Sequence, residues 1–72
     1  MTLDKAAVPA RLRIVCLHAE PSLQGRLRAL GLGEGEEVQL VGASRRVFYV
    51  RTASGGTVAL GRETARMIGV EG

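Results

Sequence analysis

Two residues with metal-binding side chains, Cys16 and His18, stand two positions apart in a mainly apolar segment. This spacing puts both side chains on one face of a β-strand, where they could reach a single metal ion. Two ligands are too few for a closed structural site, although Glu20 or a second copy of the chain could supplement them. We favour the alternative that Cys16 is a buried core thiol and His18 lies at the strand end, and we expect no metal or other cofactor.

The chain offers little else for catalysis. His18 is the only histidine, and no serine or carboxylate stands at a motif spacing that would complete a nucleophilic set with it. The phosphate-binding pattern GxxxxGK[ST] is absent. Turns explain the glycines at positions 31, 33, 35, 55 and 56 better than a phosphate cradle does. We therefore expect a binding protein and not an enzyme.

The charge balance is basic, with ten Lys and Arg against seven Asp and Glu, and a net charge of +3. Such a balance permits contact with nucleic acid, anionic lipid or an acidic protein surface, and selects none of them. Phe48 and Tyr49 lie close to Arg45, Arg46 and Arg51, as in surfaces that stack nucleic-acid bases. Adjacent strand residues point to opposite faces, so only one of the two rings can be exposed. Nucleic-acid binding is therefore an alternative that we do not favour.

The elements that position these residues can be predicted from hydrophobic periodicity and turn residues, which indicate five short strands, one helix and one helical turn. The strands are expected at 11–18, 37–40, 47–50, 58–60 and 68–70, the helix from Pro21 or Ser22 to about Leu30, and the helical turn at 62–67. The predicted fold is mainly β, a small and strongly bent barrel with the helix after the first strand.

Several residues have predicted places in this fold. The core face of the first strand is expected to carry Leu12, Ile14 and Cys16, and Leu3 and Val8 are expected to dock the lead-in segment. A stripe of Leu23, Leu27 and Leu30 should face the core from the helix, which should end at Gly31 in a left-handed conformation. Loops are expected at 42–46 and 54–57, and Ala65 should face inward.

The bulk properties favour one small domain over residues 1–72. One cysteine cannot form an internal disulfide and fits a reducing compartment. No run approaches the length of a membrane span, and the first ten residues do not resemble a signal peptide. We expect a cytoplasmic protein without membrane insertion.

Two segments resemble the ferrous iron transport protein A (FeoA) family. Residues 26–38, RLRALGLGEGEEV, are similar to the family's pattern RLxxLGLxxGxxV, and residues 58–70, VALGRETARMIGV, are similar to its ending IALRxxxAxxIxV. The chain departs from the pattern at Ala10, where glycine is usual, and at Glu34, where proline is frequent. Its loop at 42–46 is also expected to be shorter than is usual in the family.

The resemblance implies an SH3-like barrel that assists a membrane ferrous-iron transporter, by contacting the transporter's cytosolic GTP-binding domain. It implies a partner-binding surface at Arg28, Leu30, Gly31 and Leu32. The alternative for these residues is structural: Leu30 completes the helix stripe and Leu32 packs on the helix end. Domains of this type also occur in metal-dependent repressors, so a metal-responsive interaction module remains a third possibility. We expect a monomer or a weak homo-oligomer.

Overall fold

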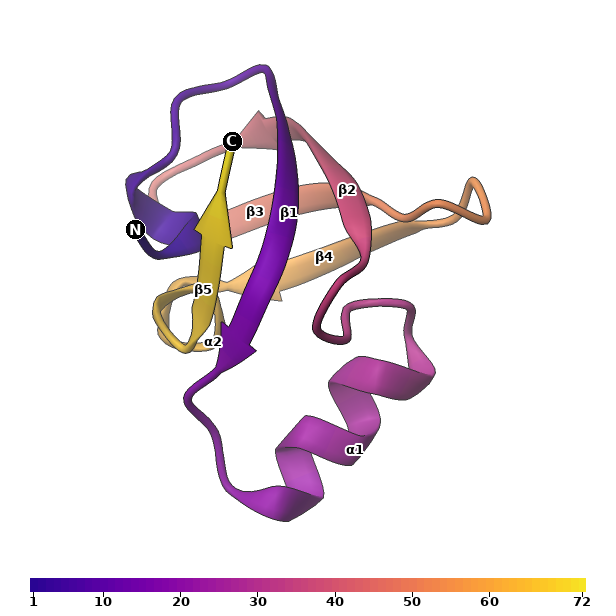
Figure 1. Cartoon of the computed structure of the whole chain (residues 1–72). Coiled ribbons are helices and arrows are strands. Elements are labelled where there is room, and N and C mark those ends of the chain that lie inside the picture. Colours follow the sequence, from indigo (N-terminus) through magenta and orange to yellow (C-terminus); the bar gives the residue numbers. More distant parts are fainter.

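A single antiparallel sheet forms the body of the molecule in the computed structural model, which covers residues 1–72 (Figure 1). The elements in chain order are a 3-10 helix η1 at Leu3–Lys5, β1 at Ala10–Leu17, α1 at Pro21–Ala29, β2 at Glu37–Ala43, β3 at Val47–Arg51, β4 at Thr57–Gly61, α2 at Arg62–Arg66 and β5 at Ile68–Glu71. The five strands lie in the order β4-β3-β2-β1-β5. The predicted mainly β class, with a helix after the first strand and a helical turn before the last, is confirmed.

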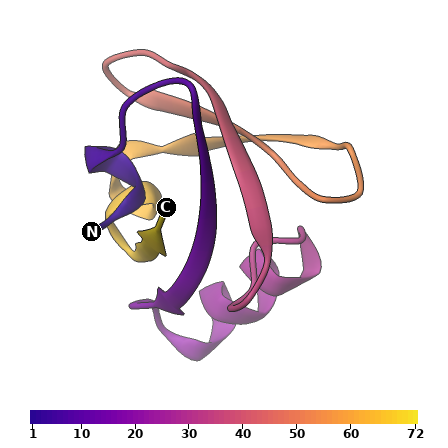
Figure 2. The same cartoon turned by 45° about the horizontal axis from the view of Figure 1, so that its top comes forward.

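The sheet bends strongly around its core without closing into a full barrel. β4 and β5 are the two edge strands and do not pair with each other. A curved β1 passes across the molecule while the β3–β4 hairpin projects from the body, as Figure 2 shows. The SH3-like description fits this arrangement of five antiparallel strands with short helices between them.

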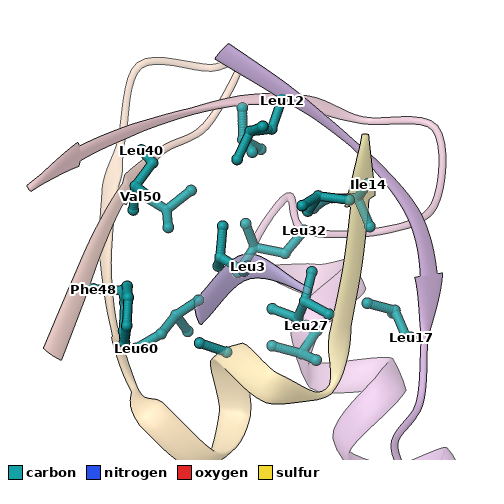
Figure 3. Close-up of a cluster of buried hydrophobic side chains, with 14 residues drawn as sticks. Leu3, Leu12, Ile14, Leu17, Leu27, Leu32, Leu40, Phe48, Val50 and Leu60 are labelled. Atoms are coloured by element: carbon teal, nitrogen blue, oxygen red, sulfur yellow. The ribbon is translucent and has the colours of Figure 1, made fainter. Parts of the chain in front are cut away.

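Alternating side chains of the strands supply most of the core (Figure 3). Leu12 and Ile14 point inward from β1, as do Leu40 of β2 and Phe48 and Val50 of β3. The full cluster comprises Leu3, Leu12, Ile14, Leu17, Leu27, Leu32, Val38, Leu40, Phe48, Val50, Leu60, Ala65, Ile68 and Val70. The predicted inward positions of Leu3, Leu12, Ile14 and Ala65 are therefore confirmed.

A β-bulge near the end of β1 moves one predicted core residue out of the core. The register of β1 against β5 shifts between Ile14 and Cys16. Beyond the shift Leu17 points inward and is 6% exposed, while Cys16 is only partly buried. The prediction of Cys16 as a buried core thiol is wrong, because an extra residue in the strand reverses the faces of all residues that follow it.

Two predictions about loops also need correction. Val8 is 42% exposed and does not anchor the lead-in segment, a role that falls to Leu3 alone at 1% exposure. The loop expected at 42–46 is shorter, because β2 continues through Ala43 across a second register shift between Leu40 and Gly42. Only residues 44–46 separate β2 from β3.

A tight hairpin turn joins β3 to β4, as the residues at 54–57 predict. The backbone N–H of Gly55 donates to the Thr52 carbonyl at 2.9 Å, and the backbone N–H of Thr52 donates to the Gly56 carbonyl at 2.8 Å. Gly55 has a φ of +97°, a conformation that glycine adopts at little cost. This is a three-residue hairpin loop with a bulge at the left-handed glycine.

Candidate docking corner

The last turn of α1 ends in a Schellman motif. The Leu32 N–H donates to the Leu27 carbonyl at 2.9 Å, and the Gly31 N–H donates to the Arg28 carbonyl at 3.1 Å. Gly31 has the left-handed φ of +87° that this motif requires. The predicted glycine cap is confirmed, and it turns the chain sharply so that Leu30 and Leu32 point in different directions.

Leu30 and Leu32 have opposite environments. Leu32 is 1% exposed and packs in the core with Leu27, which is the apolar contact that usually accompanies this cap. Leu30 is 50% exposed, although its spacing predicts that it completes the stripe begun by Leu23 and Leu27. The placement of Leu32 on a contact surface is therefore wrong, and so is the placement of Leu30 on the buried stripe.

Gly31 also connects the end of α1 to the β3–β4 hairpin. A Cβ on Gly31 would lie 3.3 Å from the Cβ of Thr52, so the backbone of the cap rests on this side chain. Thr52 is 6% exposed, and its hydroxyl contacts the Ser54 hydroxyl at 3.0 Å and the Gly56 carbonyl at 3.3 Å. Thr52 could not be identified from the sequence, because its contact with Gly31 joins segments about twenty residues apart.

Arg28 lies beside this cap in a network of polar side chains. Its Nε and Nη2 donate to the two carboxylate oxygens of Glu34 at 3.1 and 2.9 Å, and Nη2 also reaches Gln24 Oε1 at 3.3 Å. Gln24 in turn donates to the carbonyls of Leu17 and Ala19 at the end of β1. Arg28 is therefore fixed in position as half of an ion pair with Glu34.

The Arg28–Glu34 pair shifts the pKa of both groups. The hydrogen bonds from Arg28 and its charge lower the pKa of the Glu34 carboxyl, and the same contacts raise the pKa of Arg28. Both side chains are about half exposed, at 48% and 42%, so solvent weakens their attraction. The pair orients the Arg28 side chain and adds little to stability.

We use the name docking corner for Arg28, Leu30 and Gly31, with Leu32 removed from the predicted set. An apolar side chain projects here from a rigid turn, next to an oriented guanidinium group. None of the three surface hollows of the molecule includes any of these residues; each hollow is lined in part by Arg11. The docking corner therefore suits a protein surface better than a small molecule.

Cys16 and His18 do come together, as their spacing predicts. Cys16 Sγ lies 3.1 Å from His18 Nε2, on the outer side of the sheet. The sulfur occupies the space that a Cβ on Gly69 would need, so Gly69 makes room for it on β5. No third His, Cys, Asp or Glu joins the pair in a group that could hold a metal ion, and Glu20 does not supplement it.

The two aromatic residues of β3 lie on opposite faces of the sheet, as the strand alternation predicts. Phe48 is 3% exposed and belongs to the core, whereas Tyr49 is 43% exposed on the outer face. Arg45, Arg46 and Arg51 are all exposed. A single ring is therefore available for stacking, which is a small platform for nucleic acid.

No helix of the structure is long and apolar enough to cross a membrane.

Solved structures that are closely similar in fold include two proteins of known source. The FeoA protein from Chlorobium tepidum, solved by NMR in solution, superposes with a TM-score of 0.88 at 23% sequence identity, covering 99% of this chain and 69% of that one. The NMR structure of a FeoA-like protein from Clostridium acetobutylicum gives a TM-score of 0.83 at 18% identity, covering 99% of this chain and 84% of that one. These likenesses establish the fold.

Among curated proteins, none matches the sequence. The family model described as the FeoA domain, in contrast, matches residues 1–72, and so includes both segments in which the resemblance was found. The chain therefore belongs to the FeoA family, whose members are small accessory domains with a role in ferrous iron transport.

Proposed function

We propose that this protein is a cytoplasmic accessory factor that docks on the cytosolic GTP-binding domain of a membrane ferrous-iron transporter through the docking corner. The observation that carries this proposal is the 50% exposure of Leu30 at the C-cap of α1. Leu30 continues the stripe of Leu23 and Leu27 to the end of the helix, where its side chain is available to a partner.

The rigidity of the docking corner supports the same proposal. Two backbone hydrogen bonds, from the N–H groups of Gly31 and Leu32, hold the cap, and Gly31 packs against the Thr52 side chain of the hairpin. Arg28 is held by Glu34 and Gln24. A surface that is ordered before binding loses little conformational entropy when a partner covers it. Covering the exposed half of a leucine is worth about 1 kcal/mol.

Any effect on the transporter would then arise in the transporter itself. The chain has no phosphate-binding loop and no catalytic set, so GTP hydrolysis and gating belong to the partner. Docking changes them only to the extent that the docking corner binds one state of the partner more tightly than another.

Calorimetric titration of the transporter's GTP-binding domain with two variants tests this function. Leu30→Gln should weaken binding by about tenfold, because it puts a polar group where the partner covers an apolar one. Val8→Gln is the matched control: Val8 is 42% exposed, in the loop before β1. Its affinity should equal that of the unmodified protein. Equal affinities for both variants, or no binding by the unmodified protein, would contradict the proposal.

A further inference from the structure

The sheet leaves the outer side of β4 unpaired. β4 bonds to β3 in a continuous register from Arg51↔Thr57 to Val47↔Gly61 and has no strand on its other side. The opposite edge of the sheet is covered: Thr2 pairs with Gly69 of β5, and Val70 donates to the Met1 carbonyl at 2.7 Å. Only one edge of the sheet is therefore free along its length.

The hairpin register shows which backbone groups face this free edge. Thr52 and Gly56 form the first hydrogen-bonded pair after the turn. Bonded and non-bonded pairs alternate from there along an antiparallel ladder. The backbone N–H and C=O groups of Thr57 and Ala59 and the N–H of Gly61 consequently point away from β3 and are free, whereas the Gly61 carbonyl belongs to the N-cap of α2. Val47 fits this alternation, because its carbonyl accepts a hydrogen bond from the Ser44 N–H on the β2 side and not from Gly61.

The free edge lacks the features by which proteins usually prevent strand addition. Residues 57–61, TVALG, include no charged residue and no proline, and the β3–β4 register contains no bulge. Thr57, Ala59 and Gly61 are exposed and small, so their side chains do not obstruct an incoming strand. The hairpin also projects from the body of the molecule (Figure 2).

The charge around this edge is one-sided. Residues 38–62 include four arginines and no Asp or Glu, which leaves the other 47 residues with six basic and seven acidic side chains, a net charge of −1. The four are Arg45, Arg46, Arg51 and Arg62. None of them forms an ion pair, whereas Arg13, Arg28 and Arg66 each have an acidic partner.

The unpaired arginines stand at both ends of β4. Arg51 is opposite Thr57 in the register. Arg62 directly follows Gly61, donates to the Arg45 carbonyl at 2.9 Å and lies 5.2 Å from the centre of the Phe48 ring. An extended chain paired with β4 would run between these two groups of positive charge. Two copies of the hairpin, in contrast, would bring like charges together.

From these observations we infer that the β4 edge receives an extended, acidic peptide segment of another protein as an added strand. The backbone groups of Thr57 and Ala59 and the N–H of Gly61 would supply the hydrogen bonds, and the arginines would select for negative charge. The exposed Tyr49, which is opposite Ala59 in the register, offers an apolar contact to an alternate side chain of the peptide. This surface shares no residue with the docking corner and does not depend on the function proposed for it.

The test uses fluorescein-labelled heptapeptides and the ¹⁵N-labelled full chain. The first peptide alternates glutamate with valine, the second replaces every glutamate with lysine, and the third replaces the central valine of the acidic peptide with proline. We expect saturable anisotropy change with the first peptide only, because lysine reverses the charge and proline removes a ladder bond. Amide exchange at Thr57, Ala59 and Gly61 should slow on binding.

Three variants separate backbone pairing from charge. Ala59→Pro removes one outward N–H without breaking a β3–β4 bond and should weaken peptide binding at least about tenfold. Arg45→Glu with Arg46→Glu should weaken it comparably while leaving the ladder intact, which provides a test even if Ala59→Pro does not fold. Lys5→Glu with Arg26→Glu makes the same change of net charge at exposed positions of η1 and α1; it is the charge-matched control and should bind normally.

Four results would overturn the inference. The first is no binding of the acidic peptide. The second is equal binding of the acidic and proline-containing peptides, because it would mean charge attraction without strand addition. The third is tighter binding of a single-stranded oligonucleotide than of the acidic peptide at the same arginines. The fourth is protection of the β4 amides that rises with protein concentration alone, because it would assign the edge to a second copy.

Discussion

At the residue scale, Gly31 is required both for its backbone conformation and for its lack of a side chain. Its φ is +87°, and a Cβ would approach Thr52 to 3.3 Å. We expect Gly31→Ala to lower the free energy of unfolding by about 1–2 kcal/mol, from the left-handed conformation together with this contact. Urea denaturation followed by circular dichroism measures the change.

Two other glycines of the chain serve as controls for Gly31→Ala. Gly35 has the same φ of +87° but nothing within 4 Å of its missing Cβ, so Gly35→Ala isolates the backbone cost. Gly25 lies inside α1 in open space, where Gly25→Ala should raise stability by about 0.5–1 kcal/mol. A Gly31→Ala variant that is no less stable than Gly35→Ala would contradict the packing of Gly31 on Thr52.

The Arg28–Glu34 pair predicts a pH-dependent contribution that is confined to acid. Because the folded-state pKa of Glu34 is lowered, its contribution to stability is complete above the unfolded value of about 4.3 and is lost as pH falls through the folded value. NMR titration of the Glu34 carboxyl should show its pKa rising toward the ordinary value in Arg28→Gln. The pKa should stay unchanged in the control Arg26→Gln, and a rise in both variants would mean a general charge effect.

Sequence analysis located most residues of the site but not their exposure. The packing of Leu32 on the helix end was one of the two predicted alternatives and is confirmed, whereas the spacing of Leu23, Leu27 and Leu30 did not show that Leu30 remains at the surface. The Arg28–Glu34 contact was likewise not predicted. Glu34 is a departure from the family's frequent proline, and only the folded turn brings it to Arg28.

At the scale of the element, the end of α1 carries one buried leucine, Leu32, and one exposed leucine, Leu30. Leu32→Ala should destabilise the fold by about 2–5 kcal/mol, because Leu32 is 1% exposed and its removal leaves a cavity. Leu30→Ala should cost less than about 1 kcal/mol, because the side chain is half exposed. Thermal and urea unfolding of both variants check the difference, and equal losses would contradict the assigned exposures.

The strands were predicted better than their pairing. Turn residues and β-prone runs place all five within a few positions of their observed bounds. The bulges near Val15 and Val41 were not predicted, because apolar residues run without a polar interruption through 14–17 and the period of two cannot show a shift there. The identity of Leu17 as the core residue in place of Cys16 follows from the bulge alone.

At the scale of the whole molecule, the sequence and its family resemblance predicted the fold class correctly, but not that β4 would be a free edge. Nothing in the run Val58–Leu60 distinguishes an edge strand from a central one, because strand order depends on long-range pairing. The charge asymmetry is visible in the sequence, since residues 38–62 lack acidic side chains. Only the fold shows that these arginines lie near the ends of the unpaired β4 edge.

The same asymmetry predicts the oligomeric state. Like charges on the β4 edges of two copies should keep the protein monomeric at physiological salt, with any association increasing as salt screens the arginines. Sedimentation velocity at low and high salt measures this. A dimer that is stable at micromolar concentration in low salt would show that the edges attract each other, and would contradict the predicted effect of the arginines.

An NMR titration of the ¹⁵N-labelled protein with the GTP-binding domain of the transporter, and separately with short RNA and DNA, tests whether the docking corner binds this partner. We expect saturable shifts clustered at Arg28, Leu30 and Gly31 on addition of the domain. This expectation would be contradicted by no response to the domain together with shifts at Arg45, Arg46 and Arg51 on addition of nucleic acid.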